Sequence, residues 1–215
     1  MKKYKIFSKV RFNELLILLI IGSFIGYILE GIWIYILFGV IESHSSLVIG
    51  PFCVVYGIGF AAAYAISSKV EEKNIFQIFF TYAFVGAITE YICSYLQELF
   101  LGSRSWNYVD HFLNINGRTS LKMFIIWGLL GVVFIKFMYP YIKKMFRKLN
   151  QLALGKICLL VTIFMIFDCT LTILAINRWN GRIHNIEATS YIERQLDKYY
   201  NDEKMKEIFC NMKFN

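Results

Sequence analysis

The sequence predicts an all-α protein that crosses a membrane about five times. Hydrophobic residues make up 57% of the 215 residues and charged residues only 18%, whereas soluble domains carry about 25% charged residues. The apolar residues form long runs separated by short polar segments. These runs show no alternation of period two, which favours helices over a membrane barrel. The composition excludes a soluble globular enzyme, a disordered chain and a disulfide-stapled secreted domain.

Five apolar runs approach or exceed the length of about 20 residues that a helix needs to span the hydrocarbon core. They cover residues 12–38, 51–67, 75–100, 121–141 and 157–176. The second run is short but has no charge. Residues 1–176 therefore form a predicted transmembrane domain. The remaining 177–215 mix apolar and charged residues, and we expect an amphipathic tail that lies on the membrane or covers the mouth of the bundle.

The distribution of basic residues predicts the orientation. The N-terminal segment and the segments after the second and fourth runs hold twelve Lys and Arg, whereas those after the first and third hold two. The positive-inside rule then places the N-terminus in the cytoplasm, and five spans place the C-terminus outside the cell membrane. The net charge of +8 is thus a topology signal, and no nucleic-acid partner is expected.

Two parts of the chain resemble each other. Residues 24–32 and 84–92 share Phe, Gly, Ile, Glu and Ile at a constant offset of 60, and residues 54–57 resemble 125–128 at an offset of 71. This pattern predicts a duplicated two-helix hairpin, with repeats 12–67 and 75–141, followed by a fifth helix. Chance similarity between apolar helices is the alternative.

Three acidic residues lie deep within the predicted spans, away from their ends. Glu30, Glu90 and Asp168 each lie about 12–15 Å from the predicted outer end of their helix. A charge in hydrocarbon costs about 2.5–3.5 kcal/mol, so such residues face the bundle interior, pair or stay protonated. They either brace helix packing or form a site for a cation, a proton or a polar headgroup. Arg118 stands near the outer mouth, where it is either solvated or able to reach Glu30, Glu90 or an anionic ligand.

No catalytic signature is present. The chain lacks GxSxG, the Walker GxxxxGK[ST] and HExxH, so we expect no enzyme and no cofactor. His44, His111 and His184 lie beside acids in the outer segments, but no HxxxH spacing supports a metal site. The five cysteines show no CxxC spacing, and four lie in apolar runs, where cysteine is usually a small hydrophobe.

Six motifs are shared with a known family. They are Glu30, Gly50-Pro51-Phe52-Cys53-x-x-Tyr56-Gly57-x-Gly59, Glu90, Trp106-x-Tyr108, Asn114-x-x-Gly117-Arg118 and Asn211-Met212. Together, over nearly the whole chain, they resemble the bacterial ABC-transporter permease family, type IV. The chain departs from the family pattern at Ser45-Ser46 (usually Arg-Gly), Val54 (Pro), Asn107 (Asp) and Cys210 (Pro). The resemblance implies a permease-like role, adds Tyr56, Trp106 and Asn114 to the expected ligand-binding residues, and implies an ATPase partner on a separate chain.

The leading hypothesis is therefore a transporter component of the bacterial inner membrane. Its polar site would lie in the outer half of the helix bundle and bind a cation or a lipid or envelope-related ligand. The expected ligand-binding residues are Glu30, Glu90, Asp168, Arg118, Tyr56, Trp106 and Asn114. An intramembrane enzyme acting on a lipid-linked substrate and a non-catalytic assembly or regulatory factor are the alternatives. Membrane lipid, a separate ATPase and a second copy of the chain are the partners considered.

Overall fold

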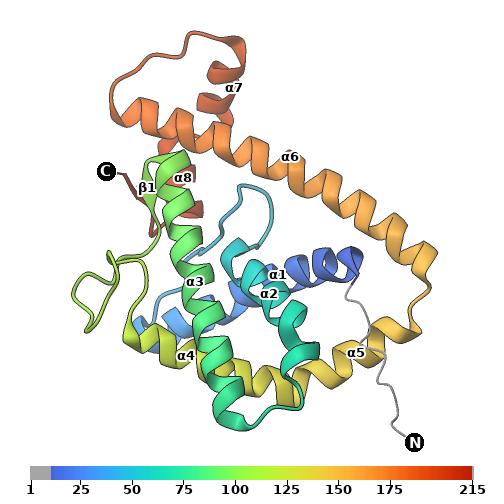
Figure 1. Cartoon of the computed structure of the whole chain (residues 1–215). Helices are drawn as coiled ribbons and strands as arrows, with labels where there is room; N and C mark the ends of the chain where they lie inside the picture. Colours follow the sequence, from blue (N-terminus) through green and yellow to red (C-terminus); the bar gives the residue numbers. More distant parts are fainter. Residues whose placement is uncertain (1–10, 215) are drawn as a thin grey trace, which may run out of the picture.

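A computed structural model of the chain describes residues 11–214 (Figure 1). The described part is mainly helical. Its elements are α1 (Phe12–Phe38), α2 (Val54–Val70), α3 (Ile75–Leu101), β1 (Ser103–Arg104), α4 (Leu121–Val133), η1 (Phe134–Met138), α5 (Tyr139–Lys148), α6 (Gln151–Ile183), α7 (Tyr191–Tyr199), α8 (Asp202–Ile208) and β2 (Lys213–Phe214). The all-α prediction is confirmed, apart from the two-residue strands β1 and β2, which pair antiparallel.

Four helical segments of the described chain are long and apolar enough to cross a membrane. They are Phe12–Phe38, Ile75–Leu101, Leu121–Lys148 and Gln151–Ile183. The expected second span corresponds to α2, which has 17 residues and is about 25 Å long, less than the roughly 30 Å of a hydrocarbon core. The structure thus confirms a polytopic membrane fold with four long spans, and a crossing by α2 stays a prediction.

The fourth span is one continuous helix with a π-helical turn in its middle. The turn, η1, joins α4 to α5, and the N–H of Tyr139 donates to the carbonyl of Phe134, five residues back. Pro140 follows immediately. Proline has no N–H, and its ring crowds the carbonyl four residues earlier, which a π turn relieves. The helix therefore continues past the proline to Lys148.

The helix ends follow local sequence signals. Ser120 caps α4 by accepting from the N–H of Met123, and Asn74 and Asn150 cap α3 and α6 in the same way. α1 and α3 end at Gly39 and Gly102, which adopt the left-handed conformation that glycine tolerates best.

α1 packs on α2, α3 packs on α4, and α2 with α3 joins the two hairpins. Glycines at the contacts make this approach possible. A Cβ at Gly26 would overlap the Tyr56 side chain, and a Cβ at Gly86 would overlap that of Trp127. Small residues at such crossings are the usual way in which membrane helices gain close van der Waals contact.

The tail packs on the segments between the helices of each hairpin. β2 pairs with β1, which follows α3, and Phe209 forms a β-bridge with His44, which follows α1. Residues 39–53, residues 102–120 and the tail therefore share one end of the molecule, which we call the loop end. Figure 1 shows the long α6 leading from α5 to this end.

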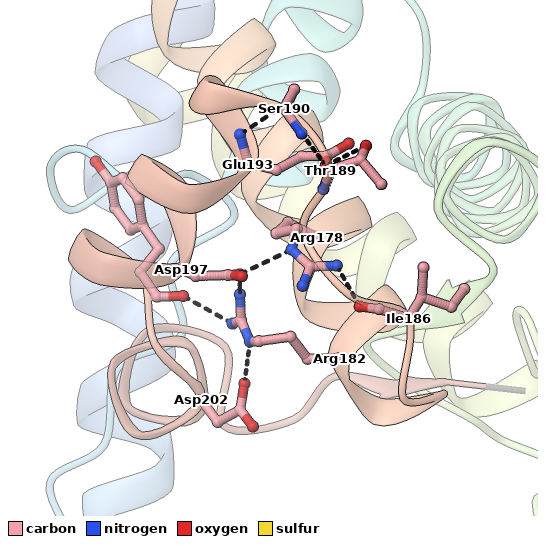
Figure 2. A network of polar contacts seen from close by, with 9 residues as sticks. Arg178, Arg182, Ile186, Thr189, Ser190, Glu193, Asp197 and Asp202 are labelled. Carbon is pink, nitrogen blue, oxygen red and sulfur yellow. Dashed lines mark hydrogen bonds and ion pairs between the residues drawn. The ribbon is translucent and has the colours of Figure 1, made fainter.

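The docked tail is held by an ion-pair network and a small apolar core. Asp197 pairs with both Arg178 (2.8 Å) and Arg182, and Arg182 also pairs with Asp202 (2.6 Å) (Figure 2). Met205 and Ile176 are completely or almost completely buried in the core beneath it. The tail, which was expected to be amphipathic, thus packs over part of the loop end in this structure.

Candidate functional site

Glu30 of α1 and Glu90 of α3 belong to one polar cluster at the loop end. The Tyr108 hydroxyl donates to Glu90 at 3.0 Å. Tyr56 of α2 bonds to the carboxylate of Glu30, and its hydroxyl also interacts with Tyr108. We call Glu30, Tyr56, Glu90 and Tyr108 the paired-glutamate cluster. It brings together three of the expected site residues and one, Tyr108, that was expected only as part of a motif.

Glu90 is the more enclosed of the two acids. Only 4% of its surface is exposed, and its second oxygen, Oε2, has no hydrogen bond within residues 11–214. Thr119 and Trp127 face this carboxylate, yet their side-chain donors also lack a partner there. Burial, followed by the charge of Glu90, raises the pKa of Tyr108, so its hydroxyl stays protonated and donates at neutral pH.

Glu30 is partly open and has different neighbours. Its side chain keeps 27% of its surface exposed, and the Nδ1 atom of the buried His44 lies 3.6 Å from one oxygen. The Cys53 thiol donates to the other oxygen at 3.8 Å. Both neighbours come from residues 39–53, so the first loop forms the outer wall of the site. His44 and Cys53 were not expected as site residues, and the Gly-Pro motif that contains Cys53 was the available signal.

Asp168 contacts the protein backbone and has a different role from the two glutamates. It is fully buried and its Oδ1 accepts from the backbone N–H of Ile49 at 3.1 Å and from Thr172 at 3.4 Å. The Thr172 hydroxyl in turn accepts from the N–H of Val48 at 3.0 Å. Asp168 therefore anchors the first loop to α6. A ligand-binding role for it stays a prediction.

Arg118 is buried and pairs with an acid other than those expected. It donates to Ser94 at 3.2 Å and forms an ion pair with Glu98, which Arg104 also contacts at 2.8 Å. Its guanidinium lies over the rings of Tyr91 and Tyr95. Within the described chain it forms no ion pair with Glu30 or Glu90. Arg118 therefore ties the end of the second loop back to α3, within the second hairpin. No arginine or lysine of residues 11–214 pairs with the paired-glutamate cluster.

Trp106 and Asn114 stabilise the conformation of residues 102–120, the second loop. The Trp106 ring N–H donates to the carbonyl of Arg118 at 3.0 Å. Asn114 donates to the carbonyl of Val109 at 2.8 Å and accepts from the N–H of Gly117 at 3.0 Å. These bonds fix the turn that presents Tyr108 to Glu90. Contact of Trp106 or Asn114 with a ligand stays a prediction.

An apolar cavity lies between α6 and the first hairpin. Its volume is about 400 Å³ and it is lined by residues of α1, α2 and α6, among them Leu19, Val54, Ile58, Val161 and Ile166. The cavity separates α6 from the first hairpin along part of its length. In a bilayer such a space suits hydrocarbon, because its lining offers almost no polar partners.

These features define a polytopic helical membrane protein with a pair of acids, one buried and one partly exposed, at one end of its bundle. The family described as "Putative ABC-transporter type IV" matches residues 17–173. The chain belongs to this family, as its motifs predicted, and the match extends from α1 into α6, ending before the tail with its Asn211-Met212 motif. No curated protein and no solved structure matches at a significant level.

Proposed function

We propose that this protein is the membrane-embedded, permease-like subunit of an ATP-driven transporter and that the paired-glutamate cluster binds a positively charged group. The observation that carries the proposal is the charge balance of the site. Two carboxylates share it, and their neighbours among residues 11–214 are hydroxyl, thiol, indole and imidazole groups. Neutral donors offset only part of the cost of a charge away from water. A cation, or a bound proton, supplies the rest.

The positive charge could belong to a small inorganic cation or to the ammonium group of a lipid-like molecule. The apolar cavity between α1, α2 and α6 supports the second source, since an acyl chain would fill it. The partly open Glu30 supports access from the loop end, because its carboxylate is the exposed edge of the cluster.

The energy source would be a separate chain, because the 215 residues contain no Walker motif. Its docking surface would lie at the end opposite the loop end, where Lys143 pairs with Glu71 at 2.9 Å. α5 offers basic residues there, among them Lys144 and Arg147. Co-purification with a co-expressed ATPase subunit tests this part, and charge reversal at Lys144 and Arg147 should weaken it.

Ligand-dependent thermal stability tests the cation site. The purified protein would be titrated in detergent with NaCl, KCl or tetramethylammonium chloride at constant ionic strength, and separately with phosphatidylethanolamine or phosphatidylglycerol in mixed micelles. A ligand at 100 times its Kd stabilises the folded state by about 2.7 kcal/mol. We expect one cation or the ethanolamine lipid, but not the anionic lipid, to raise the melting temperature.

Glu30→Gln with Glu90→Gln should abolish that rise. The matched control is Glu71→Gln, which removes an acid from an ion pair at the opposite end and should keep it. The proposal fails if the double variant responds as the original protein does, or if no tested cation or lipid has an effect.

A further inference from the structure

Glu42, His44 and Cys210 form a group of metal-ligating side chains outside the paired-glutamate cluster. One ligand atom from each of the three lies within 4.8 Å of the others. Glu42 and His44 come from the first loop, and Cys210 from the tail, 166 residues later. No local sequence spacing could reveal this group, because only the folded tail brings the cysteine to the loop.

We propose that these three residues bind a zinc ion that links the tail to the first loop. An imidazole nitrogen, a thiolate and a carboxylate are the three side-chain donors that zinc uses in proteins. The Nε2 atom of His44 lies 4.0 Å from the Cys210 sulfur. Zn–N bonds of about 2.0–2.1 Å and Zn–S bonds of about 2.3 Å place such a pair about 3.6 Å apart in a tetrahedron, so a small closing movement is enough.

Metal binding at Nε2 of His44 requires the proton on Nδ1. The Nδ1 atom lies 2.6 Å from the side-chain amide nitrogen of Asn211 and 3.6 Å from a carboxylate oxygen of Glu30. The carboxylate favours the proton on Nδ1, and a half-turn of the Asn211 amide brings its oxygen to that N–H. The lone pair is then on Nε2, which faces Cys210. Histidines that bind metals usually donate their other N–H to such an oxygen.

The burial pattern allows an ion to enter. His44 is 8% exposed, while Glu42 and Cys210 are exposed. The buried ring is thus held in place, and the two exposed ligands can close over the ion. Three protein ligands leave a fourth position of the tetrahedron for water. Because His44 also contacts Glu30, zinc would fix the outer wall of the paired-glutamate cluster, but the zinc site does not depend on what that cluster binds.

Metal analysis of the full chain tests the site. The protein would be purified in detergent without a polyhistidine tag, stripped with a chelator and titrated with Zn²⁺ against a chromogenic chelator. We expect about one zinc per chain, and an affinity at least about tenfold lower in Cys210→Ser and Glu42→Gln. Replacing Zn²⁺ with Co²⁺ should give a thiolate-to-metal absorption band, which Cys210→Ser should abolish.

Cys53→Ser and His184→Gln are the matched controls. Cys53 is another free cysteine near Glu30, and His184 bonds to the Asn180 carbonyl, away from the group. Both variants should keep the stoichiometry, and Cys53→Ser should keep the cobalt band. Thermal unfolding of each metal-free variant confirms that it is folded. The proposal is overturned if the chain binds no zinc at micromolar concentration, or if Cys210→Ser leaves both affinity and cobalt band unchanged.

Discussion

The α1–α2 and α3–α4 hairpins pack their helices through corresponding positions. Gly26 contacts Tyr56 in the first, and Gly86 contacts Trp127 in the second. Gly86 follows Gly26 by 60 residues and Trp127 follows Tyr56 by 71 residues, which are the offsets that relate the two similar sequence segments. At a second corresponding contact the glycine and the aromatic residue change places between the two helices. Gly22 faces Phe60 in the first hairpin, and Tyr82 faces Gly131 in the second. This shared contact pattern supports the proposal of a duplicated hairpin, and chance similarity between apolar helices stays the alternative.

The loops of the two hairpins are held in different ways. The second loop is closed within its own hairpin by the ion pairs of Glu98 with Arg118 and Arg104, and its strand β1 also pairs with β2 of the tail. The first loop has no Lys or Arg. Instead, Asp168 of α6 and the tail hold it. The difference explains why Glu30 is partly open while Glu90 is enclosed. Among the parts outside the hairpins, α6 and the tail complete the wall around Glu30.

Loss of Arg118 should have the largest effect on the second hairpin. Breaking a buried ion pair by removing one partner typically costs about 3–5 kcal/mol. Arg104 still pairs with Glu98, so we expect Arg118→Gln to cost about 3 kcal/mol in thermal unfolding in detergent. Lys143→Gln, which breaks the more exposed pair with Glu71, should cost less than about 1 kcal/mol. Equal effects of the two variants would contradict a closure of the loop by Arg118.

Adding a single methyl group to the shared contacts should affect both hairpins alike. Gly26→Ala and Gly86→Ala each place a Cβ against an aromatic side chain, and such overpacking costs about 1–3 kcal/mol. Gly31 has no atom within 4 Å of its added Cβ, so Gly31→Ala is the matched control and should be neutral or stabilising. Thermal unfolding measures all three. If only one hairpin responds, the two are not packed equivalently.

Loss of Asp168 should affect the first loop alone. Asp168→Ala removes the acceptor for the N–H of Ile49, and an unsatisfied buried donor costs about 1–3 kcal/mol. We therefore expect hydrogen exchange in residues 45–52 to accelerate about tenfold, with no change in residues 103–120. Asp168→Asn keeps an acceptor oxygen and serves as the control. Acceleration in both loops would show that they are not held independently.

The helices were predictable from sequence, but the pairing of their polar side chains was not. The length and apolar character of the runs predicted α1 and α3 to within one residue. The fourth span continues seven residues beyond its predicted end, to Lys148, and α6 begins six residues before and ends seven residues after its predicted bounds. Depth along a helix predicted one level for Glu30, Glu90 and Asp168. The structure brings Glu30 and Glu90 into one cluster, whereas Asp168 accepts from the first loop. Depth could not resolve the direction in which Arg118 points, which decides between Glu90 and Glu98. The contact of His44 with the tail also had no local signal, because it depends on where α6 delivers residues 209–214.

The smallest expected effect concerns the tail, which completes the first loop. Burial alone would raise the pKa of Asp197, but its hydrogen bonds and charge interactions with Arg178 and Arg182 lower it below 3.8. A lowered folded-state pKa means that the stabilisation is complete above the unfolded value and is lost as the pH falls through the folded value. We therefore expect hydrogen exchange of residues 191–208, corrected for its intrinsic pH dependence, to be constant from neutral pH to about pH 4 and to accelerate below it.

Asp197→Asn should weaken this acceleration at low pH, with an effect on stability at neutral pH of less than about 1 kcal/mol. Glu207→Gln, in an exposed pair with Lys204, should leave it unchanged. If the acceleration below pH 4 is unchanged in Asp197→Asn, then groups other than Asp197 and its two arginines on α6 hold the tail in place.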